Sequence, residues 1–329
     1  MFLVIMIVVC ALAFDFINGF HDTANAIATV VSTRVLSPRA AILMAGSLNL
    51  VGALCFTKVA ETIAKGLVTG ATLPVILAAI LGAIVWNLAT WYFGIPSSSS
   101  HALVGGLVGA AWVHGGRSSI KWEGVLDKVV LPLVLSPLAG FVIGFIVMAS
   151  IFLFFANAQA AKTGRVFRGL QIVSSAIMSF AHGSNDAQKS MGIIALALTT
   201  LSGHALTKAP VPIWVKIACA VAMAAGTSMG GWRIIKTMGH KIIRLEPVNG
   251  FAAETTASLI ILYATLTGKT VSTTHVISGS IFGVGAAKRF SAVRWSVAQT
   301  MLVAWVLTIP AAATVAALCY FGIKVLGVH

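Results

Sequence analysis

The sequence predicts an all-α polytopic membrane protein that consists of two inverted-topology repeats, with broken helices and paired re-entrant hairpins. Three observations predict this fold class: long apolar segments recur along the 329 residues, two motifs occur once in each half, and Lys and Arg gather in alternate loops. The composition agrees, because 58% of the residues are hydrophobic and 9% are charged, whereas soluble domains carry about 25% charged residues.

The apolar segments approach the length that a bilayer requires, which is about 20 residues for each helix. They are spread evenly along the chain and are too numerous for the core of a soluble protein. The segments cover residues 2–14, 40–57, 73–93, 102–113, 129–156, 190–201, 211–231, 251–267, 276–287 and 296–323. We therefore expect a multi-pass protein in contact with membrane lipid.

Two motifs recur in the same order and indicate an internal duplication. Residues 16–22 read FINGFHD, and residues 180–186 read FAHGSND, 164 positions later. Residues 94–101 read GIPSSSSH, and residues 268–275 read GKTVSTTH, 174 positions later. The sequence thus predicts a first repeat at 1–156, a cytoplasmic linker at 157–169 and a second repeat at 170–329.

The basic residues predict how the chain is oriented. Loops at 34–39, 162–168, 233–244 and 288–294 carry more than half of the 22 Lys and Arg residues, and such loops face the cytoplasm. Both termini then lie outside, and each half crosses the membrane an odd number of times, as in secondary transporters whose site is near the midplane. The net charge of +14 forms no basic stripe with interleaved aromatic residues, so we expect no nucleic-acid partner.

Four of the eight acidic residues fall inside the predicted spans: Asp15, Asp22, Asp186 and Glu254. A carboxylate at the bilayer centre costs about 2.5–3.5 kcal/mol on insertion scales, so it normally faces a cavity or an ion. Asp22 and Asp186 occupy equivalent positions of the repeat, which favours a functional role over a purely structural one.

Amide side chains and a glycine accompany each of these two carboxylates. Gly19 and Gly183 are expected to let their helices unwind and free backbone carbonyls, and the amides add hard oxygen ligands for a small cation. The predicted cation-coupling residues are Asn18, Asp22, Asn25, Asn185 and Asp186.

Runs of Ser and Thr precede two predicted helices, and they favour an anion. These residues cap helix N-termini, where free N–H groups and a partial positive charge bind phosphate or sulfate. Each run follows an apolar segment after a short turn, which predicts a re-entrant hairpin whose tip lines a cavity. We expect the two tips to meet on one oxyanion through Ser98, Ser99, Ser100, Ser272, Thr273 and Thr274.

The remaining polar candidates are assigned to gating or proton handling. His101 and His275 close the two runs, where a hydrogen bond at the helix end is the simpler interpretation and proton handling is the alternative. The candidates for gating or proton handling are His21, Glu61, His101, His182, Glu254 and His275. No spaced set of metal ligands is present, so we predict no cofactor and no certain metal site beyond the coupling ion.

Two other functions fit the composition less well. An intramembrane hydrolase would need a nucleophile, but the sequence contains no G-x-S-x-G elbow and the duplication supplies two equivalent Ser/His sets. A passive anion channel would line its pore with rings of charge, and the acidic residues are too few for that. We therefore expect a transporter and not an enzyme.

These motifs resemble those of the inorganic phosphate transporter (PiT) family of cation-coupled symporters. The resemblance rests on GFHDTAN at 19–25, GSNDAQK at 183–189, the two Ser/Thr-His tips, KVAETI at 58–63 and GFAAET at 250–255. It implies secondary active symport of inorganic phosphate, coupled to H⁺ or Na⁺, by a homodimer in a bacterial or archaeal inner membrane. A metal–phosphate complex, and sulfate carried by a permease of the same fold, are alternative substrates.

Two positions depart from the signature of that family. His21 stands where the signature has Asn, and Lys189 stands where the second half would have its last Asn. The ammonium group either replaces a coupling cation or contacts phosphate, so Gln188 and Lys189 join the predicted phosphate-binding residues. The pattern resembles proton-coupled or metal–phosphate members, which favours H⁺. A charge in the membrane needs a partner, and we expect Asp186 or the anion.

Overall fold

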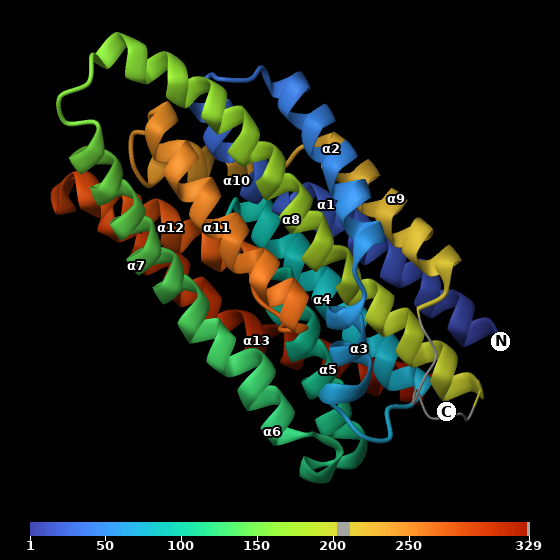
Figure 1. Cartoon of the computed structure of the whole chain (residues 1–329). Helices are drawn as coiled ribbons and strands as arrows, with labels where there is room; N and C mark the ends of the chain where they lie inside the picture. Colours follow the sequence, from blue (N-terminus) through green and yellow to red (C-terminus); the bar gives the residue numbers. More distant parts are fainter. Residues whose placement is uncertain (203–210, 328–329) are drawn as a thin grey trace.

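The computed structural model describes residues 1–202 and 211–327, and most of these residues are helical (Figure 1). The α-helices are α1 (Phe2–Ser32), α2 (Pro38–Cys55), α3 (Lys58–Gly66), α4 (Leu73–Phe93), α5 (Ser99–Gly115), α6 (Trp122–Val125), α7 (Leu131–Phe154), α8 (Ala160–Ser202), α9 (Ile213–Met229), α10 (Trp232–Lys236), α11 (Pro247–Thr267), α12 (Thr273–Lys288) and α13 (Trp295–Val325). Two π-helical turns, η2 (Leu126–Val130) and η3 (Thr237–Lys241), precede α7 and follow α10.

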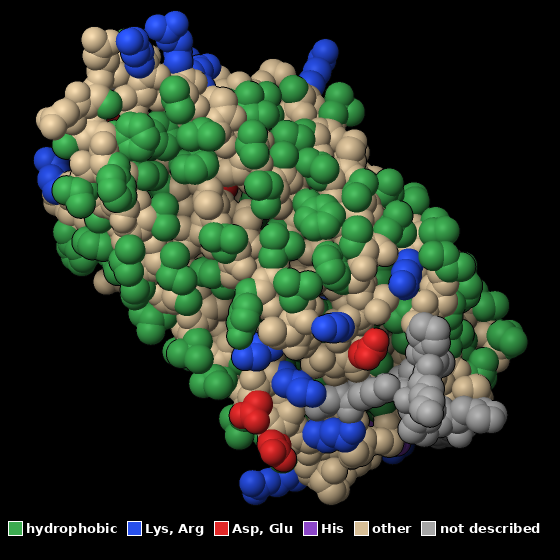
Figure 2. Space-filling model, viewed as in Figure 1, with side chains coloured by type: hydrophobic (Ala, Val, Ile, Leu, Met, Phe, Trp, Pro, Cys, Tyr) green, Lys and Arg blue, Asp and Glu red, His purple; other side chains and the backbone are tan. Residues whose placement is uncertain are grey.

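The molecule has the surface of a multi-pass membrane protein. Among the described residues, six helices are long and apolar enough to cross a bilayer, and a seventh span results if α9 and the bent segment Trp232–Lys241 are counted together. That pair is bent by 59° and is a broken helix. Figure 2 shows hydrophobic side chains over the middle of the surface, with Lys and Arg gathered toward the two ends. This distribution matches a lipid-facing belt between two aqueous faces.

Two helical hairpins have the same construction. In the first, α4 ends at Gly94, whose φ of 65° is left-handed, and Ser98 then caps α5 by accepting a hydrogen bond from His101 N at 3.2 Å. In the second, α11 ends at Gly268 with φ of 70°, and Ser272 caps α12 in the same way. Glycine ends each first helix because it adopts positive φ without strain. The repeated glycine and serine therefore set two equivalent turns.

The expected unwinding at Gly19 and Gly183 is wrong. Both residues lie inside the continuous helices α1 and α8. A Cβ atom at Gly19 would come within 2.3 Å of Met223 O, and one at Gly183 within 2.4 Å of Asn49 Cα. The glycines therefore allow α9 to pack closely on α1, and α2 on α8.

The connection between the halves is shorter than the predicted linker at 157–169. The helix α8 already begins at Ala160 and continues for 43 residues. It includes the apolar segment 190–201, so that segment is no separate span. The irregular part of the connection is confined to residues 155–159.

Candidate functional site

The first hairpin tip meets α1 through Ser99. Its hydroxyl lies 2.7 Å from Asp22 Oδ2 and 2.8 Å from Asn18 Oδ1. Asn18 and Asp22 are one helical turn apart, so they share a face of α1. All three side chains are buried. The first motif and the first Ser run, 77 residues apart, thus form one polar cluster.

The tip of the second hairpin contacts both α1 and α8. Asn25 Nδ2 donates to the hydroxyls of Thr274 at 3.0 Å and Thr273 at 3.2 Å. Thr274 Oγ1 donates to Asp22 Oδ1 at 3.2 Å, and Thr273 Oγ1 donates to Asp186 Oδ2 at 3.3 Å. The threonines therefore connect the carboxylate of one half to that of the other.

The two tips also touch each other. Ser100 Oγ donates to the carbonyl of Val271 at 3.2 Å, and the rings of His101 and His275 lie 5.0 Å apart. His275 stacks on Trp305 with ring centroids 4.0 Å apart. The first turns of α5 and α12 consequently face one another, as the two Ser/Thr runs predicted.

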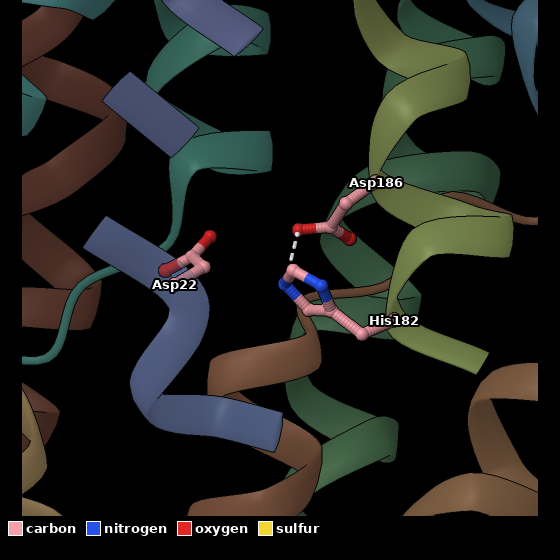
Figure 3. Close-up of side chains that lie close together, drawn as sticks. All are labelled: Asp22, His182 and Asp186. Carbon is pink, nitrogen blue, oxygen red and sulfur yellow. Dashed lines mark ion pairs between the residues drawn. The ribbon is translucent and has the colours of Figure 1, made fainter. Parts of the chain in front are cut away.

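Asp22, His182 and Asp186 form a compact group of side chains of the types that coordinate cations (Figure 3). The figure shows Asp22 on α1 pointing toward the other two side chains, which come from α8. One ligand atom from each residue lies within 4.8 Å of the others, and all three residues are buried. His182 Nε2 is 3.4 Å from Asp186 Oδ2. Two buried carboxylates this close repel each other unless a proton or a cation is shared between them.

Lys189 pairs with Asp186, as expected for a buried ammonium group. Its Nζ lies 2.6 Å from Asp186 Oδ1, and both side chains are at most 1% exposed. The pair spans three residues of α8, a spacing that places both side chains on one face of the helix. Asp22 has a different partner, because His21 Nδ1 lies 2.8 Å from its Oδ1.

Gln188 is engaged away from the tips. Its Oε1 accepts hydrogen bonds from Val59 N at 2.8 Å and Ala60 N at 3.3 Å, at the start of α3, and its Nε2 donates to Ser184 O. Among the described contacts, the carboxamide thus holds α3 against α8 and has none with a Ser/Thr run. Asn185 likewise donates to Thr265 Oγ1 at 3.0 Å, near the end of α11.

The two glutamates predicted for gating lie in different environments. Glu61 is exposed on α3. Glu254 is buried on α11, where its Oε1 accepts a hydrogen bond from Thr29 and its Oε2 accepts one from Ser174 at 2.5 Å. Neither belongs to the cluster formed by the tips, although Thr29 continues the polar face of α1 beyond Asn25.

Three polar residues of the site were not predicted from the sequence. Asn49 Oδ1 lies 3.1 Å from His182 Nδ1, Thr90 Oγ1 lies 3.1 Å from His21 Nε2, and Ser190 donates to the buried Asp15 at 2.6 Å. Asn49 and Thr90 are polar residues inside apolar segments, and this is the one feature of the sequence that could have identified them as members of the site.

Comparison with known proteins gives one consistent result. The phosphate transporter family matches residues 18–316. A "Probable low-affinity inorganic phosphate transporter" of Bacillus subtilis (strain 168) is 54% identical over 97% of this chain and 96% of the relative. One of Rhizobium meliloti (strain 1021) with the same description is 50% identical over the same shares. A solved structure, "The sodium-dependent phosphate transporter", matches with a TM-score of 0.91 and 25% identity, covering 99% of this chain and 100% of that one.

Proposed function

This chain belongs to the phosphate transporter family and carries inorganic phosphate across a membrane, and we propose that it does so as a secondary active symporter that binds phosphate between its two hairpin tips. The observation that carries this proposal is that each tip presents a hydroxyl to a buried carboxylate, Ser99 to Asp22 and Thr273 to Asp186. The relatives are described as phosphate transporters, which favours phosphate over sulfate.

The tips supply groups that bind an anion. The first-turn N–H groups of a helix have no partner within the helix and carry a partial positive charge of about half an elementary charge. Two such helix starts, α5 and α12, face each other here, and Ser98, Ser99, Ser100, Ser272, Thr273 and Thr274 add hydroxyl groups. Lys189 stands beside Asp186 and contributes a full positive charge at the same centre.

The carboxylates explain why a cation would have to accompany the anion. Asp22 and Asp186 carry two negative charges, and Lys189 neutralises one of them. Adding phosphate to this buried centre leaves an excess of negative charge, which is costly where water is excluded. A cation held by Asp22, Asp186 and the neighbouring amides Asn18, Asn25 and Asn185 would remove that cost. Binding of cation and anion would then be cooperative, which is the basis of symport.

We propose H⁺ or Na⁺ as the coupling ion. A solved relative described as sodium-dependent supports Na⁺. The Lys189–Asp186 pair at 2.6 Å supports H⁺, because the ammonium group occupies a carboxylate oxygen that Na⁺ would otherwise bind. A metal–phosphate complex is the second candidate, because His182 places an imidazole beside two carboxylates and such mixed nitrogen and oxygen ligands suit divalent transition metals.

The finer features of the fold belong to the same proposal. Residues 1–156 and 170–329 would be inverted repeats, with re-entrant tips near the midplane, the connection inside, and both termini outside. The equivalent packing of α9 on Gly19 of α1 and of α2 on Gly183 of α8 supports this arrangement. The resemblance to the family adds a homodimer in the cell membrane, which the mass of the detergent-solubilised protein would test.

Uptake of radiolabelled phosphate into proteoliposomes tests the coupling. A pH gradient, a Na⁺ gradient and a divalent cation such as Mg²⁺ or Co²⁺ are applied separately. Accumulation above the external concentration with one of the two gradients identifies the coupling ion, and a strict need for the divalent cation identifies a metal–phosphate substrate. Equilibration without accumulation under all three conditions would contradict symport.

The same preparation tests the anion site. Ser99→Ala and Thr273→Ala each remove a hydroxyl that is worth about 0.5–1.5 kcal/mol as a hydrogen bond, so phosphate binding should weaken roughly two- to twelvefold in each variant. Ser150→Ala is a matched control, since this half-buried residue of α7 makes its one hydrogen bond among the described residues within its own helix, to Ile146 O at 2.8 Å. Parent-like affinity in both tip variants would place the phosphate elsewhere.

A further inference from the structure

Two short helical segments hold the hairpins at equivalent points. On the first hairpin, the Arg233 guanidinium of α10 donates to Tyr92 O, and Thr237 Oγ1 of η3 donates to Gly94 O at 3.0 Å. The bonds reach the last turn of α4 and the glycine that ends it. The two donors are four residues apart and lie on one face of the segment α10–η3. They can therefore both bind carbonyls at the end of α4.

The second hairpin is gripped in the same way from α3. Lys58 Nζ donates to Leu266 O at 3.0 Å, and Thr62 Oγ1 donates to Gly268 O at 2.8 Å. In both halves a basic residue and a threonine, four positions apart, bind two carbonyls that are two positions apart. We call Lys58 with Thr62, and Arg233 with Thr237, the two clamps.

The glycines show that the two clamps share their geometry. A Cβ atom at Gly94 would lie 3.3 Å from Arg233 Cβ, and one at Gly268 would lie 3.4 Å from Lys58 Cβ. Helix C-termini leave carbonyls without intrahelical partners and carry a partial negative charge, so a cation and a hydroxyl are the groups that stabilise them. The similarity extends to the backbone, with φ of 65° and 70° at the two glycines.

Each clamp is also attached to the helix that carries the carboxylate. The start of α3 is held by Gln188, two residues beyond Asp186, through Val59 N at 2.8 Å. The residue before α10, Gly231, packs so closely on α1 that a Cβ there would lie 2.2 Å from Phe20 O, two residues before Asp22. The short helices α3 and α10 are therefore attached to α8 and α1 as well as to the hairpins.

The contacts close one circuit around each carboxylate, and each circuit includes a short helix of the other half. From Asp186 the circuit runs through α3 to Gly268, and five residues later Thr273 returns to Asp186 at 3.3 Å. From Asp22 it runs through α10 to Gly94, and five residues later Ser99 returns to Asp22 at 2.7 Å. Each tip follows a glycine turn that is fixed to the helix carrying the carboxylate. The tip can therefore move little relative to that carboxylate.

We propose that the two clamps are positioning residues for phosphate binding: Lys58 and Thr62 hold the second tip at Asp186, and Arg233 and Thr237 hold the first tip at Asp22. This inference rests on the proposed binding of phosphate between the tips. Figure 1 shows α3 and α10 toward opposite ends of the molecule. Release of one clamp therefore frees one tip toward one face of the membrane, while the other tip stays in place.

The test compares phosphate affinity, measured by isothermal titration calorimetry of the purified full chain, with the rate of uptake. Thr62→Val and Thr237→Val keep the side-chain shape and remove one clamp bond each, and we expect roughly three- to tenfold weaker phosphate binding. Thr62→Ser and Thr237→Ser keep the hydroxyl and should restore most of the affinity. A tip that leaves its carboxylate more readily also raises KM more than it lowers kcat.

Two control variants change the same region without touching a clamp. Thr267 directly precedes Gly268, and among the described residues its hydroxyl bonds only carbonyls of its own helix, Tyr263 O at 2.8 Å and Ala264 O at 3.2 Å. Lys236 is exposed on α10, one position before Thr237. Thr267→Val and Lys236→Met should bind phosphate like the parent.

The outcomes separate the clamps from the anion site itself. If Ser99→Ala and Thr273→Ala weaken binding but Thr62→Val and Thr237→Val match the two controls, the clamps do not position the tips. If the tip variants bind like the parent, the proposed phosphate site is wrong and the clamp proposal fails with it. Should either valine variant not fold, Lys58→Met and Arg233→Met carry the same test, because both side chains are exposed.

Discussion

Asp22 receives hydrogen bonds from three elements at once. His21 approaches from α1 itself, Ser99 from the first tip and Thr274 from the second. The Asp22 carboxylate thus accepts hydrogen bonds from both hairpins. Neutralising it removes the charge that we propose attracts the coupling cation. An amide of the same shape keeps one oxygen acceptor and replaces the other with an NH2 group, to which a hydroxyl can turn and accept.

Asp22→Asn should therefore lose gradient-driven phosphate uptake while it inserts and folds normally. Uptake in proteoliposomes and thermal unfolding in detergent measure the two properties separately. Asp127→Asn provides the matched change at an exposed acid and should transport like the parent. Gradient-driven uptake at the parental rate by Asp22→Asn would show that its charge is not part of the coupling.

Lys189→Asn should make phosphate binding depend on Na⁺. We propose that the ammonium group, 2.6 Å from Asp186, does the electrostatic work of one coupling cation, and the variant replaces it with an amide oxygen that can bind one. Phosphate titrations in Na⁺ and in choline buffers measure the dependence, and Lys288→Asn, which breaks the exposed pair with Glu246, is the control. An unchanged requirement for two or more Na⁺ in parent and variant would make Lys189 structural.

The sequence identified the carboxylates and the Ser/Thr runs because duplication marked them twice. Asn49 and Thr90 occur in apolar segments without such a mark, and their contacts with His182 and His21 arise from packing between helices. The contact of Gln188 with α3 was unforeseen for the same reason, since it joins residues 129 positions apart. A motif reveals which residues matter together, but the direction of each side chain follows from the packed helices.

At the scale of helices, small residues decide which surfaces can meet. The sequence indicated the two hairpins correctly, since a glycine followed by Ser or Thr has a local meaning. It indicated unwinding at Gly19 and Gly183 incorrectly, because a glycine that loosens a backbone and one that admits a neighbouring helix look alike in a single sequence. Met223 O and Asn49 Cα, which approach these two glycines, lie far away along the chain.

Gly183→Ala should destabilise the protein by about 1–3 kcal/mol, the usual cost of overpacking, and should weaken phosphate uptake, since the shift of α2 disturbs the turn before Asp186. The added methyl group would lie 2.3 Å from Asn49 O. A Cβ atom added at Gly164, on the same helix, would meet no described neighbour within 4 Å, so Gly164→Ala should be neutral or slightly stabilising. Equal unfolding temperatures for the two variants would refute close packing as the role of Gly183.

For the whole molecule, the alternation of basic loops and apolar helices predicts which ends face which compartment. We expect Asn157→Cys to react with a membrane-impermeant maleimide only from the cytoplasmic side, and Gly327→Cys only from the outside. Both positions are exposed. The four native cysteines are replaced beforehand, because all of them are free thiols.

Labelling of both positions from one and the same side would contradict an odd number of crossings between them. Asn157 then needs a different assignment, and the two halves could not be inverted relative to each other. This measurement is independent of transport, so it tests the architecture even in variants that no longer carry phosphate.

The length of α8 has a mechanical consequence. Its 43 residues make a rod of about 65 Å, whereas a bilayer with its headgroups is about 40–45 Å thick. The rod is longer than that thickness, and the exposed Lys162 in its first turns lies about 36 Å along it from Asp186. A tilt of a few degrees at the carboxylate is thereby magnified to several ångströms at the far end. A spin label at Lys162, which is exposed, would therefore report a small tilt of α8 at Asp186 as a larger displacement at this end of the helix.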